Sequence, residues 1–344
     1  MQELWTARRR LLGLVAASAS ALVLSACGGS DGTPQFFPPA IGQKYTALYA
    51  VGASLSDTGN TCTASPSSCP PSPPYAVGVA SNGTLWIQTV AANYRVAANP
   101  SLKGGTNYAY GGARTGAVPS PVAGAPALTG TVPSMVQQLD TYLGTSSLRA
   151  DPSALYVVDG STFGNNFNAA ATAATQAGLT GAALQTYFSN VTAAAVGDIV
   201  GIVNKLYFAG ARNILVFNVP DLGLTPLLTG NGAAPGNANA VAATQLSVGY
   251  NQNLAAQFTT FAPSWQGLNI KTFDSFTFLR TMTANPAANG YTNVTQACCL
   301  PPITSLPSGF LCSTPGSYLY WDTFHPTAFT GGKIAQQVIT LLGP

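Results

Sequence analysis

The chain contains a single histidine, His325, and an aspartate stands three residues before it, at Asp322. A carboxylate at this spacing can reach the imidazole ring, fix its tautomer and stabilise the imidazolium that forms when the ring takes up a proton. The plainer alternative is a helix-capping aspartate beside a solvent-facing histidine. Because only 7% of the residues are charged, the sequence favours an acid–base pair near the C-terminus.

A candidate nucleophile lies near the other end of the chain. Ser54 follows the apolar run at 45–51 and is set between small residues. A serine in a tight turn after a buried strand is presented above the edge of a sheet. Clusters of Gly, Ser, Thr and Asn usually mark plain turns. Ser54 is therefore a strong candidate for the nucleophile only when it is considered together with Asp322 and His325. These three residues predict acyl transfer by a Ser–His–Asp relay, which requires no metal and no cofactor.

Apolar runs and helical stretches alternate along the chain, and these elements must position the three residues. Strands separated by crossover helices form a parallel sheet that is covered on both faces, with ligands at the carboxyl ends of its strands. The sequence therefore predicts one α/β domain over residues 45–344, with three α/β/α layers. The expected strands are 45–51, 154–158, 214–219 and 268–273, and the expected helices are 85–94, 133–143, 184–211, 240–258 and 332–342.

Four blocks of sequence resemble those of the SGNH/GDSL hydrolases, in the order of that family. Residues 52–60 (Gly-Ala-Ser-Leu-Ser-Asp-Thr-Gly-Asn) are similar to its opening block, and residues 322–326 (Asp-Thr-Phe-His-Pro) to its closing block. Residues 107–113 (Asn-Tyr-Ala-Tyr-Gly-Gly-Ala) and 164–167 (Gly-Asn-Asn-Phe) resemble the second and third blocks. The resemblance implies a flavodoxin-like fold with a mostly parallel central sheet, and a serine hydrolase acting on acyl esters.

The resemblance also implies roles for individual residues. Ser54 would be the nucleophile, His325 the base and Asp322 its partner. The oxyanion hole would be formed by the N–H groups of Ser54 and Gly112 and by the side-chain amide of Asn166, with Asn165 as the alternative. Two positions depart from the family pattern: Ala53 and Phe167 stand where the family carries aspartates.

The N-terminal segment reads as an export and anchoring signal. Three arginines (8–10) precede an apolar stretch at 11–24, and the run Leu-Ser-Ala-Cys at 24–27 resembles a bacterial lipobox. We expect residues 1–26 to be a lipoprotein signal peptide, Cys27 to carry the lipid and residues 27–44 to form a flexible tether. The alternative is an ordinary signal peptide, with Cys27 a bystander. Either places the protein in the bacterial cell envelope, anchored at the outer membrane or the periplasmic face, or outside the cell. No later segment is expected to span a membrane.

The remaining five cysteines read as disulfide candidates, because an exported protein meets an oxidising compartment. Cys62 and Cys69 would close one Pro- and Ser-rich loop. Cys312 could pair with either Cys298 or Cys299, which leaves one thiol over. A zinc site is not expected, because the chain has one histidine and its cysteines lack two close pairs.

Charge narrows the possible partners. The formal net charge is only +3, and the three arginines of the N-terminal segment account for much of it. Nucleic-acid binding needs many Lys and Arg residues on one face, so no nucleic acid is expected as a partner. The expected substrate is a short- or medium-chain ester or a lipid ester. Phospholipase, lysophospholipase or acyltransferase activity, deacetylation of carbohydrates, and an inactive envelope lipoprotein that binds glycan or lipid remain as alternatives.

Overall fold

The computed structural model describes residues 42–300 and 309–344. The predicted signal peptide and the lipidation site Cys27 lie outside the described residues.

The centre of the domain is a parallel sheet with the strand order β1-β2-β3-β4. A parallel bridge between Ala50 and Asn107 places the segment around residue 107 beside the free edge of β1. Counting that segment, the order is that of the flavodoxin-like fold, as expected. The strands are β1 (Leu48–Val51), β2 (Leu155–Asp159), β3 (Asn213–Phe217) and β4 (Asn269–Phe273).

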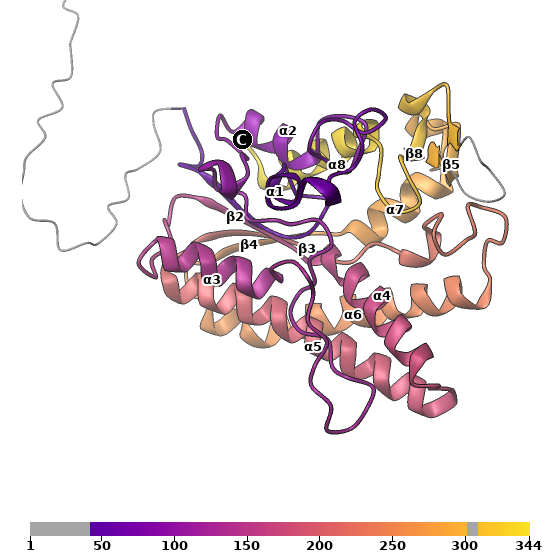
Figure 1. Cartoon of the computed structure of the whole chain (residues 1–344). Coiled ribbons are helices and arrows are strands. Elements are labelled where there is room, and N and C mark those ends of the chain that lie inside the picture. Colours follow the sequence, from indigo (N-terminus) through magenta and orange to yellow (C-terminus); the bar gives the residue numbers. More distant parts are fainter. Residues whose placement is uncertain (1–41, 301–308) are drawn as a thin grey trace, which may run out of the picture. The chain divides into compact units, whose positions relative to one another are not determined.

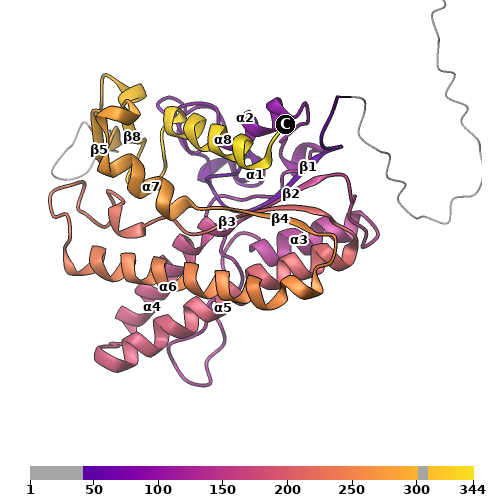
Figure 2. The same cartoon turned by 180° about the vertical axis from the view of Figure 1, so that it is seen from behind.

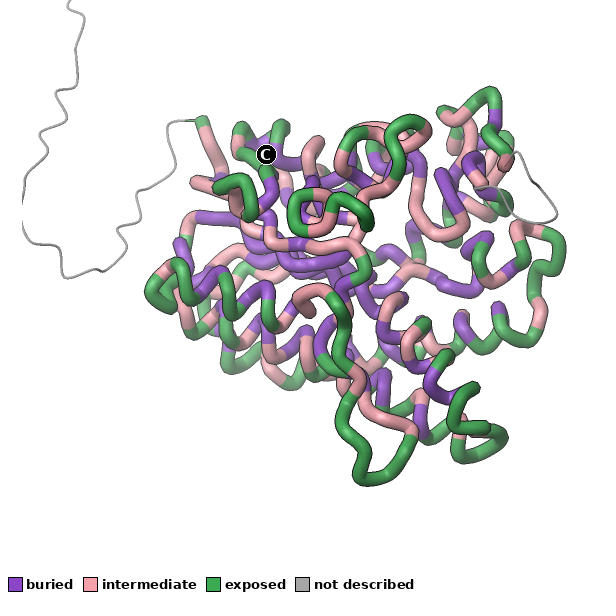
Figure 3. The backbone as a smooth tube through the Cα atoms, in the orientation of Figure 1, coloured by how far each residue is buried: buried purple, intermediate pink, exposed green. Residues whose placement is uncertain are grey.

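Helices cover both faces of the sheet, so the predicted three-layer α/β/α architecture is confirmed (Figures 1 and 2). Alternate residues of β2 point to opposite faces: Tyr156 and Val158 pack into one core, and Leu155 and Val157 into the other. The strands are buried between the two helical layers (Figure 3). One layer comprises α3 (Met135–Thr145), α4 (Phe163–Gln176), α5 (Gly181–Ala209) and α6 (Ala238–Phe261), and the other α2 (Trp86–Asn93), α7 (Ser275–Ala284) and α8 (Ala328–Leu342).

Several elements were not expected from the sequence. Helix α4 is dominated by Ala, Asn and Thr, helix α7 spans only ten residues, and the remaining elements are shorter still. The short elements are α1 (Asn60–Ala64), the parallel pair β5 (Asn293–Ala297) and β8 (Tyr318–Tyr320), and the antiparallel pair β6 (Cys299–Leu300) and β7 (Phe310–Leu311).

Helix α5 is long and apolar enough to cross a membrane by length and composition alone. Half of its most apolar window is nevertheless buried inside the protein, where it packs against α3, α4 and α6. This burial is typical of a core helix.

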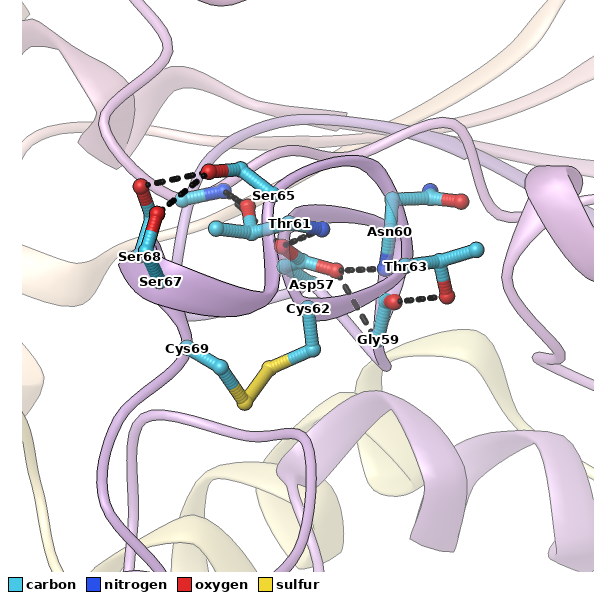
Figure 4. The surroundings of a disulfide bond; sticks show 11 residues. Asp57, Gly59, Asn60, Thr61, Cys62, Thr63, Ser65, Ser67, Ser68 and Cys69 are labelled. Atoms are coloured by element: carbon cyan, nitrogen blue, oxygen red, sulfur yellow. Dashed lines mark hydrogen bonds between the residues drawn. A yellow bond between two sulfur atoms is a disulfide. The ribbon is translucent and has the colours of Figure 1, made fainter.

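Two disulfide bonds are formed within residues 42–300 and 309–344. Cys62 pairs with Cys69, as expected (Figure 4). Cys312 pairs with Cys298, one of the two partners left open by the sequence, and Cys299 is a buried free thiol.

Candidate active site

Ser54 lies in a tight turn directly beyond the carboxyl end of β1. The carbonyl of Ala53 accepts hydrogen bonds from the N–H groups of Ser56 (3.0 Å) and Asp57 (2.9 Å). Buried Gln138 of α3 holds the start of this turn, because its side-chain oxygen accepts from the Gly52 N–H (2.8 Å) and its amide donates to the Gly52 carbonyl (3.0 Å). The turn is therefore fixed at both ends.

Asp57 organises the chain that follows the nucleophile. Its carboxylate accepts backbone N–H groups from Gly59, Asn60 and Thr61 at 2.7–3.1 Å (Figure 4). It also accepts the N–H of Gly111 (2.9 Å). One buried carboxylate thus joins the first sequence block to the second and stabilises the start of α1.

Two asparagines strengthen the same junction. The Asn107 side chain donates to the Ser56 carbonyl (2.6 Å), and the Asn60 side chain donates to the carbonyls of Asn107 (2.7 Å) and Ala109 (3.0 Å). All three hydrogen bonds are buried. Each one therefore replaces a hydrogen bond to water that the polar groups lose when the chain folds.

A different carboxylate compensates for the alanine that departs from the family pattern. Ala53 is buried, and Asp159 at the end of β2 accepts a hydrogen bond from the hydroxyl of Ser56 (2.6 Å). It also accepts the hydroxyl of Ser161. Burial raises the pKa of Asp159, although the hydrogen bonds from Ser161 and Ser56 act in the opposite direction. A brace for the nucleophile turn is present, but it comes from β2.

Ser54, His325 and Asp322 meet as the sequence predicts. Nε2 of His325 lies 2.8 Å from Oγ of Ser54, and Nδ1 lies 2.7 Å from Oδ2 of Asp322. The other carboxylate oxygen accepts the backbone N–H groups of Phe324 (2.8 Å) and His325 (2.7 Å). Burial alone would raise the pKa of Asp322, but the nearby His325 and these hydrogen bonds outweigh it and lower that pKa.

Two backbone N–H groups and one side-chain amide lie beside this relay. Gly112 has φ +79°, a conformation that favours glycine, and a Cβ there would meet nothing within 4 Å. Across residues 42–300 and 309–344, the N–H groups of Ser54 and Gly112 have no hydrogen-bond partner. Asn165 lies on the same cavity wall as Ser54 and Gly112, and its amide donates to the Ala113 carbonyl (2.7 Å).

Asn166 does not face the nucleophile, which corrects the first choice made from the sequence. Its side chain is buried and both of its polar atoms are bound to Thr115. Oδ1 accepts the Thr115 N–H (3.0 Å) and Nδ2 donates to the Thr115 hydroxyl (2.8 Å). Because neighbouring residues of a helix point about 100° apart, turning Asn165 to the cavity turns Asn166 toward the core.

The relay opens into a cavity of about 450 Å³. Ser54 and His325 lie on its wall with Gly112 and Asn165, and the loop closed by the Cys62–Cys69 disulfide contributes Cys62. Among the described residues that line it, Asp57 and His325 are the only ionisable ones apart from the disulfide-bonded Cys62, and none is Lys or Arg. The site therefore combines a nucleophile, a base and amide donors in a pocket whose described lining has no lysine or arginine.

The chain is similar to several known proteins. Two GDSL esterases/lipases of Arabidopsis thaliana are 28% and 30% identical to the chain over 138 and 143 residues. Each match covers 40% of this chain and 39% or 38% of the relative, so the chain spans about two fifths of the length of these relatives. The crystal structure of an extracellular lipase from Streptomyces rimosus matches with a TM-score of 0.41 and 15% identity, over 86% of this chain and 98% of that one. The family model for GDSL-like lipase/acylhydrolase matches residues 48–338, and the chain belongs to that family.

Proposed function

We propose that the protein is a serine carboxylester hydrolase that forms an acyl-enzyme on Ser54. The observation that carries this proposal is the unbroken hydrogen-bonded series from Ser54 through His325 to Asp322 at the wall of the cavity. Family membership supports action on ester bonds.

The proposed reaction has two halves. Oγ of Ser54 attacks the ester carbonyl carbon while its proton passes to Nε2 of His325, and Asp322 stabilises the imidazolium through Nδ1–H. Collapse of the tetrahedral intermediate breaks the bond to the alcohol, which takes the proton from Nε2. Water then repeats the sequence on the acyl-enzyme: His325 accepts its proton, the acid is released, and Oγ of Ser54 recovers its proton.

We propose that the oxyanion is stabilised by the N–H groups of Ser54 and Gly112 and by the amide of Asn165. Loss of one such donor typically lowers kcat by about 10²–10³-fold. Asn165→Ala should show a loss of this size with the folded protein intact. Asn166→Ala is the matched control, because it removes the bonds to Thr115 and should lower stability more than kcat per folded molecule. The reverse pattern would return the role to Asn166.

The cavity supports a neutral ester as the substrate. A phosphate headgroup is usually held by Arg or Lys, and neither lines the cavity among the described residues. Phe324 and Leu227 offer apolar contacts on its wall. We therefore favour short- or medium-chain acyl esters of uncharged alcohols over phospholipids. Faster turnover of lysophosphatidylglycerol than of p-nitrophenyl butyrate would overturn that preference.

The decisive experiment compares the purified protein with Ser54→Ala on p-nitrophenyl butyrate. We expect ester hydrolysis by the parent and at least a thousand-fold loss in the variant. A fluorophosphonate probe should label the parent and leave the variant unlabelled. Equal rates in the two proteins would favour a non-catalytic envelope lipoprotein that uses the cavity for binding.

We also propose that Cys27 carries a lipid anchor, on the evidence of the Leu-Ser-Ala-Cys run at 24–27. Stable membrane attachment takes more than one acyl chain, as bacterial lipoproteins carry. Cys27→Ser should move the protein from the detergent phase to the aqueous phase, or leave it unprocessed. An unmodified mature N-terminus at another residue would contradict the proposal.

A further inference from the structure

A tyrosine outside the cavity wall contacts the catalytic relay. The hydroxyl of Tyr75 donates to Oδ2 of Asp322 at 2.8 Å. That same oxygen faces Nδ1 of His325 at 2.7 Å. The Tyr75 hydroxyl and Nδ1–H of His325 therefore share one carboxylate oxygen. The hydrogen bond from Tyr75 neutralises part of the negative charge on this oxygen and so weakens its attraction for the imidazole.

The position of Tyr75 is fixed by the segment that carries Asp322. Its ring meets that of Trp321, the residue directly before Asp322, edge to face at 89° with centroids 5.8 Å apart. Both rings pack on a small apolar cluster around the Cys298–Cys312 disulfide. Since Trp321 also donates its N–H to the His325 carbonyl (2.7 Å), the tyrosine and the relay are held by one rigid unit.

The groups that face Asp322 differ in charge. They are the His325 ring, the Tyr75 hydroxyl and the Cys299 thiol. Burial raises the pKa of Tyr75, and the Asp322 carboxylate raises it further. Burial and the same carboxylate also raise the pKa of Cys299. Tyr75 and Cys299 are therefore neutral at working pH, and both face the Asp322 carboxylate as uncharged groups.

We propose that Tyr75 is a positioning residue of the relay: it holds Oδ2 of Asp322 toward Nδ1 of His325 and, by sharing that oxygen, sets how strongly the imidazole binds its proton. The expected effect of Tyr75 on turnover rests on the proposed ester hydrolysis. Its expected effect on proton binding by His325 does not depend on that proposal.

The test uses Tyr75→Phe, which removes one hydroxyl and keeps the ring against Trp321. Because His325 is the only histidine in the chain, its ring resonances can be followed by NMR through a pH titration without ambiguity. Without the neutral donor, more of the Asp322 charge acts on Nδ1–H and favours the imidazolium. We expect the midpoint of the titration to rise by about half a pH unit, and the acid limb of kcat/KM to move with it.

The kinetic readout separates positioning from folding. Since Tyr75 is not among the residues that line the cavity, KM for p-nitrophenyl butyrate should stay constant while kcat per fluorophosphonate-labelled site falls about three- to ten-fold. Tyr318→Phe is the matched control, because Tyr318 packs against the same cluster and none of the bonds to Asp322 comes from it. This variant should titrate and turn over like the parent.

Each outcome decides the proposal. The proposal would be overturned if the midpoint of the His325 titration were the same in Tyr75→Phe and in the parent. It would also be overturned if the variant lost rate only in proportion to its loss of fluorophosphonate-labelled sites. An upward shift in Tyr75→Phe alone would support it. If the parent hydrolyses no ester but the midpoint still shifts, the contact acts as proposed and the proposed function fails separately.

Discussion

The two segments that supply the relay are held by different kinds of interaction. The nucleophile segment, residues 52–61, is fixed by buried hydrogen bonds between side chains and backbone, above all at Asp57 and Gln138. The acid–base segment, residues 318–327, is held by the apolar cluster around the Cys298–Cys312 disulfide. It is also held by the Asp322 carboxylate, which accepts hydrogen bonds from Phe324 and His325. We therefore expect loss of the Asp57 carboxylate to lower mainly stability, and loss of the Asp322 carboxylate to lower mainly the rate.

The largest effect should come from Asp322→Asn. The new amide would donate to Nδ1 and hold the imidazole in the wrong tautomer, a change that costs about 10⁴-fold in kcat in a Ser–His–Asp protease. The free energy of unfolding should change far less than in Asp57→Ala, since Oδ1 can still accept its two N–H groups. Steady-state kinetics and urea unfolding measure both quantities. Equal destabilisation of the two variants would break the comparison.

Asp57→Ala should have the next largest effect, and it should appear in stability. It leaves the backbone N–H groups of Gly59, Asn60 and Thr61 without their acceptor, while the Gly111 N–H keeps the Thr61 hydroxyl (2.7 Å). A buried unsatisfied donor costs about 1–3 kcal/mol. We expect the free energy of unfolding to fall by about 4 kcal/mol, because water in the cavity can serve some of these donors. Asp57→Asn, which keeps one acceptor oxygen, should recover part of the loss in the same urea experiment.

Removing the second disulfide should rank third. Cys298 and Cys312 are 14 residues apart, and a loop of that length contributes about 3 kcal/mol in the chain-entropy account. The double variant Cys298→Ser/Cys312→Ser should lose about that much stability while keeping most of its kcat at low temperature, because the bond does not touch His325. A loss of kcat as large as that of Asp322→Asn would show that the cluster positions the relay directly.

The smallest effect concerns pH and the nucleophile segment. The raised pKa of Asp159 means that the folded state holds its proton more tightly than the unfolded state. Stability should therefore fall as pH rises from the unfolded value of about 3.9 through the folded one. Asp159→Asn should flatten this slope in urea titrations at pH 4–7, whereas Asp322, with a lowered pKa, contributes the opposite sign. An unchanged slope would contradict the assignment.

The sheet could be predicted from the sequence because its strands are short, nearly continuous apolar runs, as buried parallel strands are. The relay could be predicted because His325 is the only histidine, acidic residues are few, and Ser54 lies in a recognisable block. Helix α4 could not, since Asn, Thr and Ala dominate it and only packing against α5 shows its inner face.

The choice between Asn165 and Asn166 could not be made from the sequence for a related reason. The turn at Gly160–Thr162 precedes α4. The conformation of this turn sets the rotation of α4 about its axis, and this rotation decides which asparagine faces the cavity. Tyr75 was hidden for another reason, because 247 residues separate it from Asp322 and only the folded chain brings them together.

Because Cys298 and Cys299 are adjacent, the choice of disulfide partner for Cys312 is tied to the register of the β6–β7 strand pair. Cys299 lies opposite Leu311 in the β6–β7 pair, while the Cys312 N–H donates to the Cys298 carbonyl. A bond from Cys299 to Cys312 would slip this pairing by one residue, and such a slip sends every side chain to the opposite face. Trp321 would then lose the sulfur cluster on which it packs. Oxidative folding of this chain thus has two adjacent thiols to choose from, and the choice of Cys298 keeps the β6–β7 register.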